Sequence, residues 1–314
     1  MSVLICGSFA YDNIMVFEDR FKNHILPDKI HILNVAFLVP ELRREFGGCA
    51  GNIAYNLQLL GGDPVPMGTV GSDFAPYQSW IAKRGINSQH ITVIENALTA
   101  QAFITTDLDD NQITAFHPGA MNFAHENRVD DATDIQLGII SPDGRDGMIS
   151  HAAEFKRAGI PFIFDPGQGL PMFDGEDLKL FISQAEWVTV NDYESELMCE
   201  RTGWSLEEIA NEVQALIVTR GSEGSWIFTG GERMDIPAVP VNKLADPTGC
   251  GDAYRAGLLY GLSNELGWLA TGRLASTMGA IKIEHPGTQN HDLTRDQIAA
   301  RYEDAFGEPI SWEG

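Results

Sequence analysis

The chain has 314 residues, of which 44% are hydrophobic and 21% are charged, and this composition excludes a globally disordered protein. It carries 44 acidic and 21 basic residues, for a formal net charge of −23. Such an acidic surface repels phosphate backbones and anionic lipid headgroups, so we expect neither a nucleic-acid nor a membrane partner. The N-terminus resembles a first strand and not a signal peptide. We therefore expect a cytoplasmic protein.

Short apolar runs alternate with helical patterns along the chain. Strands are predicted at Val3–Cys6, Val65–Val70, Leu137–Ser141, Phe162–Phe164, Trp187–Val190 and Ala215–Thr219. Helices are predicted at Cys49–Leu60, Tyr77–Lys83, Gly144–Ala158 and Gly251–Leu262. This alternation predicts one α/β domain over residues 1–314, with a mostly parallel central sheet covered by helices on both faces.

Two stretches break the alternation. Asp12–Phe46 contains extended, polar-interrupted segments around Ile30–Val39, and Gln101–Phe116 reads as a hairpin that turns at Asp109-Asp110-Asn111. We interpret them as one small antiparallel sheet beside the main domain. Because two separated insertions build it, we expect a lid formed by segments of about 12–46 and 97–120.

Polar side chains follow several predicted strands, at the point where each strand ends. The residues concerned are Asp12, Asp165, Gln168, Asn191, Glu194, Thr219 and Arg220. Ligands of open α/β sheets bind beyond the carboxyl ends of the strands, so these residues predict one shared cleft.

The strongest local pattern runs from Asp246 to Asp252, with the sequence Asp-Pro-Thr-Gly-Cys-Gly-Asp, and leads into a helix. Consecutive backbone amides at a helix start form an anion site. Asp252 has two interpretations that the sequence leaves open, a helix-capping residue or a general base. Cys250 fits as a small side chain and not as a nucleophile, because no basic partner is identifiable.

Two further segments also allow two readings. Gly47–Ala54 is either a plain glycine turn into a helix, or a place where a substrate approaches the backbone beside Asn52. Asn191-Asp192-Tyr193-Glu194 is either a helix cap, or a site that holds magnesium through water.

Taken in order, four motifs resemble those of the ribokinase-like (PfkB) carbohydrate and nucleoside kinases, and the similarity covers essentially the whole chain. They are Gly47-Gly48-x-x-x-Asn52-x-Ala54, Asn191-x-x-Glu194, Val218-Thr219-Arg220-Gly221-x-x-Gly224 and Asp246-x-x-Gly249-x-Gly251-Asp252. Within the family the chain looks most like the bacterial adenosine kinases. One departure is Cys250, where the family motif that spans Asp246–Asp252 usually has Ala. Another is the lack of an arginine at 169–172, which some relatives use for phosphate contacts at the substrate end.

The resemblance implies ATP-dependent phosphorylation of the 5′-hydroxyl of adenosine, giving AMP and ADP in purine salvage, by a monomer or homodimer. The implied catalytic group comprises Asp252 as general base with Gly249, Cys250, Gly251 and Arg255. The implied nucleoside contacts are Ser8, Asp12, Gly48, Asn52, Phe103, Phe116 and Gln168. The implied ATP contacts are Asn191, Thr219, Arg220, Gly221 and Gly224.

Metal ions are implied at two places. Glu194 and Asn191 would order Mg²⁺ through water, and a K⁺ site is implied near Asp246 and Thr248. Arg255 would neutralise phosphate or form a structural salt bridge. The alternative functions are another kinase of the family, acting on a sugar or a different nucleoside, and a non-catalytic nucleoside sensor.

Overall fold

A computed structural model describes residues 1–25, 32, 34–109 and 111–313. The central sheet has nine strands over these residues, in the order β13-β12-β11-β10-β9-β8-β1-β4-β5. All neighbouring pairs from β11 to β5 are parallel, while β12 and β13 form an antiparallel edge. The strands are β1 (Ser2–Cys6), β4 (Asp63–Gly71), β5 (His90–Ile94), β8 (Ile135–Ile140), β9 (Phe162–Phe164), β10 (Trp187–Asn191), β11 (Ala215–Thr219), β12 (Ser225–Thr229) and β13 (Glu232–Ile236).

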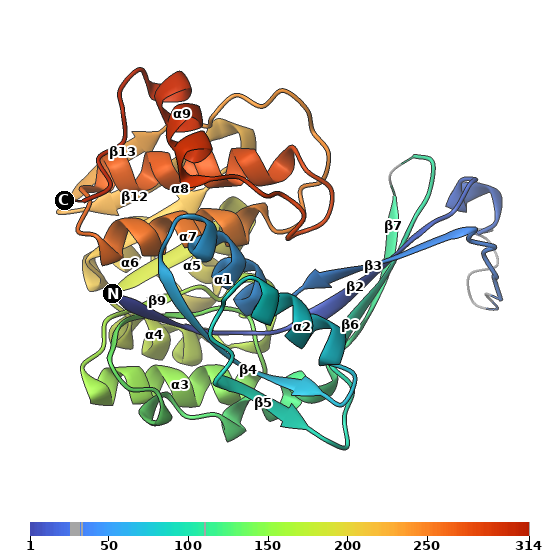
Figure 1. Ribbon diagram of the computed structural model, residues 1–314. Coiled ribbons are helices and arrows are strands. Elements are labelled where there is room, and N and C mark those ends of the chain that lie inside the picture. The colour runs from blue at the N-terminus through green and yellow to red at the C-terminus, as the bar shows by residue number, and fades with distance from the viewer. Residues whose placement is uncertain (26–31, 33, 110, 314) are drawn as a thin grey trace.

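Helices cover both faces of this sheet, as the alternation predicts (Figure 1). Successive side chains of a strand point to opposite faces, so Val3 and Ile5 of β1 pack into one core cluster and Leu4 and Cys6 into the other. The first cluster is covered by α1 (Cys49–Leu59), α2 (Ala75–Lys83), α7 (Cys250–Ser263), α8 (Trp268–Ile283) and α9 (Arg295–Phe306). The second is covered by α3 (Arg145–Ala158), α4 (Gly175–Gln184), α5 (Asp192–Thr202) and α6 (Leu206–Glu212). Over the described residues, no helix combines the length and apolar character that crossing a bilayer needs.

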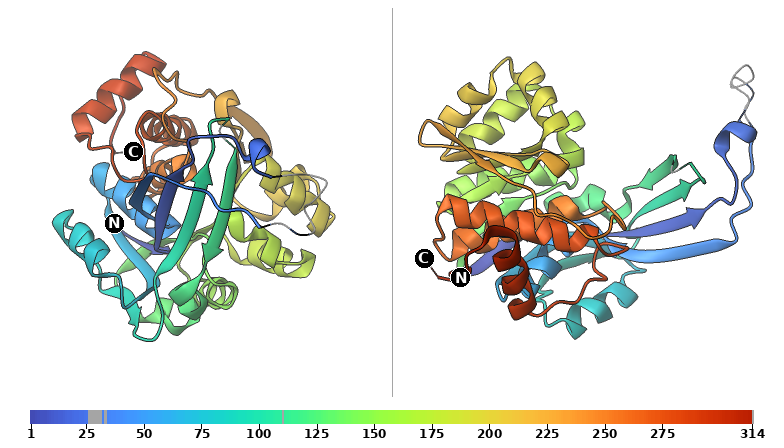
Figure 2. Two further views of the ribbon diagram at one scale, coloured as in Figure 1. Left: turned by 90° about the vertical axis from the view of Figure 1, so that its right-hand side faces the viewer. Right: turned by 90° about the horizontal axis from the view of Figure 1, so that it is seen from above.

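A second, smaller sheet projects from the body as an arm (Figures 1 and 2). It consists of β3 (Glu41–Gly47), β2 (Ala10–Val16), β6 (Ala100–Thr106) and β7 (Gln112–His117), in that order. Both outer pairs are antiparallel, as predicted, but β2 and β6 run parallel because they come from separate insertions and not from one hairpin. The expected extended segment Ile30–Val39 lies partly outside the described residues, and residues 34–39 form no strand.

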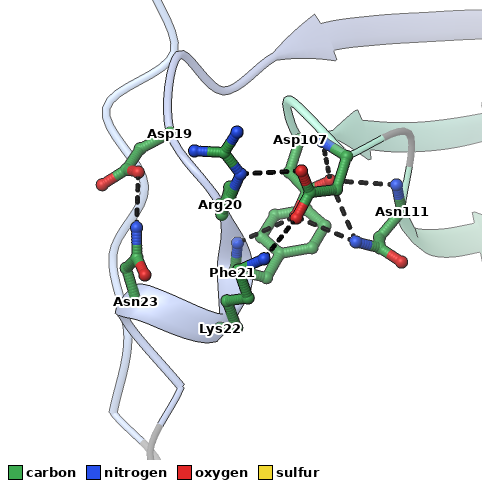
Figure 3. A network of polar contacts seen from close by, with 8 residues as sticks. Asp19, Arg20, Phe21, Lys22, Asn23, Asp107 and Asn111 are labelled. Carbon is green, nitrogen blue, oxygen red and sulfur yellow. Dashed lines mark hydrogen bonds and ion pairs between the residues drawn. The ribbon is translucent and has the colours of Figure 1, made fainter.

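The tip of this arm is held by the carboxylate of Asp107 (Figure 3). It accepts hydrogen bonds from the backbone amides of Phe21, Asp109 and Asn111, each of 2.9 Å. The predicted hairpin turn is therefore present between β6 and β7, although its residue 110 lies outside the described part of the chain. Asp107 joins the turn to the segment after β2, so the two insertions are connected at the tip.

Candidate active site

Asp252 lies in the first turn of α7, and Asn52 of α1 contacts it. Gly249 precedes the helix with φ of +79°, a conformation that favours glycine. Nδ2 of Asn52 donates a hydrogen bond of 2.8 Å to Oδ2 of Asp252. Burial raises the pKa of Asp252 to about 6, while the bond from Asn52 opposes the rise. The carboxylate is thus ionised at neutral pH, yet its pKa is closer to neutrality than that of an ordinary aspartate, as suits a general base.

The amide of Asn52 is held in one orientation by a chain of buried polar groups. Nε2 of Gln289 donates to Oδ1 of Asn52 at 3.0 Å and to the hydroxyl of Tyr77 at 2.6 Å. Nε1 of Trp80 donates to Oε1 of Gln289 at 2.9 Å. With its oxygen occupied, Asn52 presents its NH₂ group to Asp252. Sequence reasoning missed these supporting residues, because no spacing connects Gln289 with α1 and α2.

The glycine turn before α1 leaves space for Asp12. Gly48 has φ of +88°, and a Cβ there would lie 2.5 Å from the carbonyl oxygen of Ser8. A Cβ at Gly47 would lie 2.5 Å from Oδ2 of Asp12, so the carboxylate of Asp12 rests against bare backbone. Oγ of Ser8 accepts a bond of 3.3 Å from the amide of Cys49 and thus supports the turn. Burial raises the pKa of Asp12 to about 6, with further contributions from Asp246 and Glu45.

A cavity of about 740 Å³ lies at the carboxyl ends of β8–β11, and Asp252 is one of its lining residues. Five of the seven strand-end residues predicted to share one cleft line this cavity, while Asp12 and Arg220 do not. Of the predicted site residues, its walls contain Gln168, Asn191, Glu194, Thr219, Gly221, Gly224, Gly249, Cys250, Gly251, Asp252 and Arg255. An apolar wall, which sequence reasoning did not identify, is formed by Val239, Val241, Leu244, Ala280 and Ile283. Leu244 is 74% exposed.

Residues 14–295 match the pfkB family carbohydrate kinase. The chain belongs to this family. A nucleoside kinase of Methanocaldococcus jannaschii is 30% identical over 273 residues, covering 86% of this kinase and 89% of the relative. The structure of a Burkholderia thailandensis nucleoside kinase in complex with inosine has a TM-score of 0.91 at 54% identity, covering 99% of this kinase and 100% of that chain. The same kinase in complex with ADP-inosine has a TM-score of 0.88 at 56% identity, covering 98% and 97%.

The predicted α/β ribokinase-like fold is confirmed by these structures. Family membership and the match to kinase structures also establish the class of reaction, which is ATP-dependent transfer of a phosphoryl group to a hydroxyl acceptor.

Arg255 of the kinase is paired with Asp165, at the carboxyl end of β9. Nε and Nη2 of Arg255 donate to the two carboxylate oxygens at 3.1 and 2.9 Å. The two side chains are 7% and 4% exposed. Burial disfavours the charge on Arg255, but Asp165, together with Glu194 and Asp252, outweighs this effect and raises the guanidinium pKa. The structure therefore contains the salt bridge named as one alternative, while Arg255 still lines the cavity.

Asn191 and Glu194 form the cap of α5. Oδ1 of Asn191 accepts from the amide of Glu194 at 2.7 Å, and Oε2 of Glu194 accepts from the amide of Asn191 at 2.8 Å. The capping interpretation is confirmed, and both residues also face the cavity. Burial raises the pKa of Glu194, while Arg255 lowers it. Among the described residues no cluster of three His, Cys, Asp or Glu could enclose a metal ion.

Two predicted contacts, Arg220 and Phe103, are not brought beside the others. The side chain of Arg220 lies over the ring of Trp226 at 4.1 Å and pairs with Glu223 at 2.8 Å, so it is not part of the cavity wall. Strand register aligns Asp12 with Ala102, and Ala102 with Phe116, whereas Phe103 aligns with Asn13. Phe116 therefore shares a face of the small sheet with Asp12, and Phe103 points to the opposite face, because neighbours along a strand alternate. The rings of Phe103 and Phe116 therefore do not contact the same ligand if that ligand lies on one face of the small sheet.

The oxygen atoms of Asp246 are already engaged. Its carboxylate accepts from the amides of Thr248 and Gly287, each at 2.9 Å, and its carbonyl oxygen accepts from Nζ of Lys282 at 2.7 Å. These contacts order the start of the loop that leads to Asp252.

Proposed function

We propose that this kinase transfers the γ-phosphoryl group of ATP to the 5′-hydroxyl of a purine nucleoside. The observation that carries the proposal is the position of Asp252. It lies between the cavity on one side and Asn52 on the other, at the N-terminal end of α7. A hydroxyl approaching Asp252 from the Asn52 side would face a phosphate held by the α7 amides.

In the proposed reaction Asp252 accepts the proton of the 5′-hydroxyl as the oxygen attacks the γ-phosphorus. The bond from that phosphorus to the β-γ bridging oxygen breaks, and ADP leaves. The amides of Gly249, Cys250 and Gly251 stabilise the charge on the transferring group at the helix N-terminus. Asn52 keeps the carboxylate of Asp252 in position.

The acceptor would bind between the glycine turn and the small sheet. Asp12 and Asn52 offer hydrogen-bonding groups beside the bare backbone of Gly47 and Gly48, which suits the hydroxyl groups of ribose. Phe116 shares the face of Asp12 and is 51% exposed, so a planar base could cover it. The small sheet would then close over the nucleoside as a lid.

ATP would occupy the cavity. The apolar wall of Val239, Val241 and Leu244 suits an adenine ring, because it offers area and no competing polar groups. Gly221 and Gly224 have φ of +53° and +86°, and their turn lines the cavity beside Thr219. Mg²⁺ accompanying ATP would supply charge neutralisation. Glu194 fits a water-mediated contact, because its cap bond involves one carboxylate oxygen and Mg²⁺ commonly retains water.

The acceptor is tested by steady-state kinetics with ATP and Mg²⁺ over adenosine, inosine, guanosine, cytidine, ribose and fructose. Adenosine remains the acceptor predicted from the sequence, while the inosine-bound neighbours favour a 6-oxopurine. We expect a purine nucleoside to have the highest kcat/KM. A higher value for ribose or fructose would refute the nucleoside proposal and leave a sugar kinase. Binding without turnover of any acceptor would favour the sensor. The Asp252→Asn variant provides the background rate.

A further inference from the structure

Lys282 is a fully buried lysine beside the loop that carries the catalytic aspartate. It lies in the last turn of α8, and its exposed fraction is 0%. Nζ donates a bond of 2.7 Å to the carbonyl oxygen of Asp246 and one of 3.3 Å to that of His285. Lysine is almost never fully buried unless it is paired. Here both hydrogen-bond partners are backbone carbonyl groups, so the ammonium occupies a site shaped for a small cation.

The contact fixes the first residue of the loop that leads to Asp252. Lys282 holds the carbonyl oxygen of Asp246, while the amides of Thr248 and Gly287 hold its carboxylate. The amide of Asp246 also donates to the carbonyl oxygen of Ile283 at 3.2 Å. Asp246 therefore makes hydrogen bonds with Lys282 and Ile283 at the end of α8 and with Gly287 in the segment after it. Its position determines where the amides at Gly249–Gly251 point.

The positive charge of Lys282 also acts on the start of α7. Burial disfavours this charge and lowers the pKa of Lys282, while Asp246, Cys250 and Asp252 favour it. Burial raises the pKa of Cys250 to about 11, and the charge on Lys282 opposes that rise. Cys250 is the first residue of α7. The ammonium therefore adds positive potential where the helix N-terminus would meet a phosphate.

We propose that Lys282 is a positioning residue that acts as a built-in monovalent cation, so that this kinase does not depend on K⁺. This inference rests on the phosphoryl transfer proposed above. The resemblance implied a K⁺ site near Asp246 and Thr248, but the oxygens of Asp246 already accept hydrogen bonds from Lys282, Thr248 and Gly287. A K⁺ ion at this place would have to displace the ammonium group of Lys282, and the positive charge of that group would repel it.

The first test compares wild-type enzyme in chloride salts of K⁺, Na⁺ and tetramethylammonium at equal ionic strength. We expect kcat to agree within about twofold among the salts, less than ~0.5 kcal/mol. We also expect the calorimetric affinity for ADP to be the same in K⁺ and in tetramethylammonium. Activation by K⁺ of about tenfold or more, or an ADP affinity that requires K⁺, would overturn the proposal. A wild-type enzyme without turnover would instead contradict the proposed function, and the ADP titration would still test Lys282.

The second test is Lys282→Met, which keeps the side-chain length and removes the charge. We expect kcat to fall about tenfold or more, with the KM of the nucleoside changed less than about threefold, and partial recovery by K⁺ or NH₄⁺. The matched control is Lys156→Met, because Nζ of Lys156 also donates to a backbone carbonyl oxygen, that of Ser183 at 3.3 Å, but is exposed. An unchanged kcat in Lys282→Met would refute the proposal. If this variant does not fold, the wild-type salt series decides alone.

Discussion

Nδ2 of Asn52 lies 2.8 Å from Oδ2 of Asp252, although the two residues are 200 positions apart in the chain. The contact joins the first turn region of α1 to the first turn of α7. Gln289 fixes the opposite end of the same amide. The proposed base therefore has a defined orientation before any ligand is bound, as preorganised catalysis requires.

Asp252→Asn should lower kcat by about 10²–10⁴, because a general base contributes roughly that factor. The amide is nearly isosteric and can still accept the bond from Asn52, so nucleoside affinity measured by calorimetry should change little. Melting curves control for folding. A folded Asp252→Asn variant with near wild-type turnover would contradict the role of Asp252 as base.

The pH dependence of kcat/KM for the nucleoside should show an acidic limb near pH 6, because this ratio reports the groups of the ligand-free enzyme. The pKa of Asp252 is raised to about 6, so its basic form is lost as pH falls through that value, and kcat/KM falls with it. Asp12 also has a raised pKa of about 6. Asp12→Asn is therefore the matched control, and in this variant the limb should remain. A kcat/KM that is constant from pH 7 to about pH 5 would contradict the assignment.

The same raised pKa predicts a stability effect of defined sign. The carboxyl of Asp252 is harder to ionise in the folded protein than in the unfolded chain, so its contribution to the free energy of unfolding falls as pH rises from about 4 to about 6 and is constant above that. Asp252→Asn should consequently gain stability relative to wild type when pH rises from about 5 to 8. The difference between pH 5 and 8 is about 1.4 kcal/mol, because about one of the two pKa units, at 1.36 kcal/mol each, falls above pH 5. Urea unfolding at both pH values measures it, and a loss with rising pH would refute it.

Arg255→Met should destabilise the fold by about 3–5 kcal/mol, because it leaves Asp165 buried without its partner. The double variant Arg255→Met with Asp165→Leu removes both charges and should recover most of that loss in urea unfolding. Its activity separates the two roles of Arg255. A stable double variant with normal turnover shows a salt bridge only, whereas a stable but inactive one shows that Arg255 or Asp165 also acts on the ligands. A double variant as unstable as the single would contradict the pairing argument.

Nucleoside binding should slow amide hydrogen exchange together in segments 12–25 and 100–117, if the small sheet closes over the acceptor. Asp107→Ala should remove the link between the two insertions at the tip of the small sheet. Amide exchange at Phe21 and Asn111 should then become faster, because these amides lose their hydrogen-bond acceptor. Asp109→Ala is the control, since within the described part of the chain the carboxylate of Asp109 pairs with the exposed side chains of Arg20 and Lys22 and with no backbone amide. Protection confined to Gly249–Asp252 on nucleoside binding would count against a lid.

The sequence by itself determined the parallel sheet, because apolar runs and helix signals alternate along most of the chain. It predicted the strands at 162–164 and 215–219 with their observed ends. It also singled out the loop that carries the proposed base, because glycines at a helix start indicate a particular backbone conformation and an anion site. Segments with weaker local signals were misjudged. In the first insertion the strands are Ala10–Val16 and Glu41–Gly47, while residues 34–39 form no strand and the rest of the predicted segment lies partly outside the described residues.

Only the tertiary structure decided which side chains from distant segments lie close to one another. Strand register separates Phe103 from Phe116, although both are aromatic residues of one hairpin. Arg255 meets Asp165, and Lys282 meets the carbonyl oxygen of Asp246, across 90 and 36 positions of sequence. Such pairings depend on how helices pack against the sheet, and no period or motif along the chain encodes a distance between segments. The physical reason is that burial makes each charged group need a partner, and only the folded chain determines which partner is within reach.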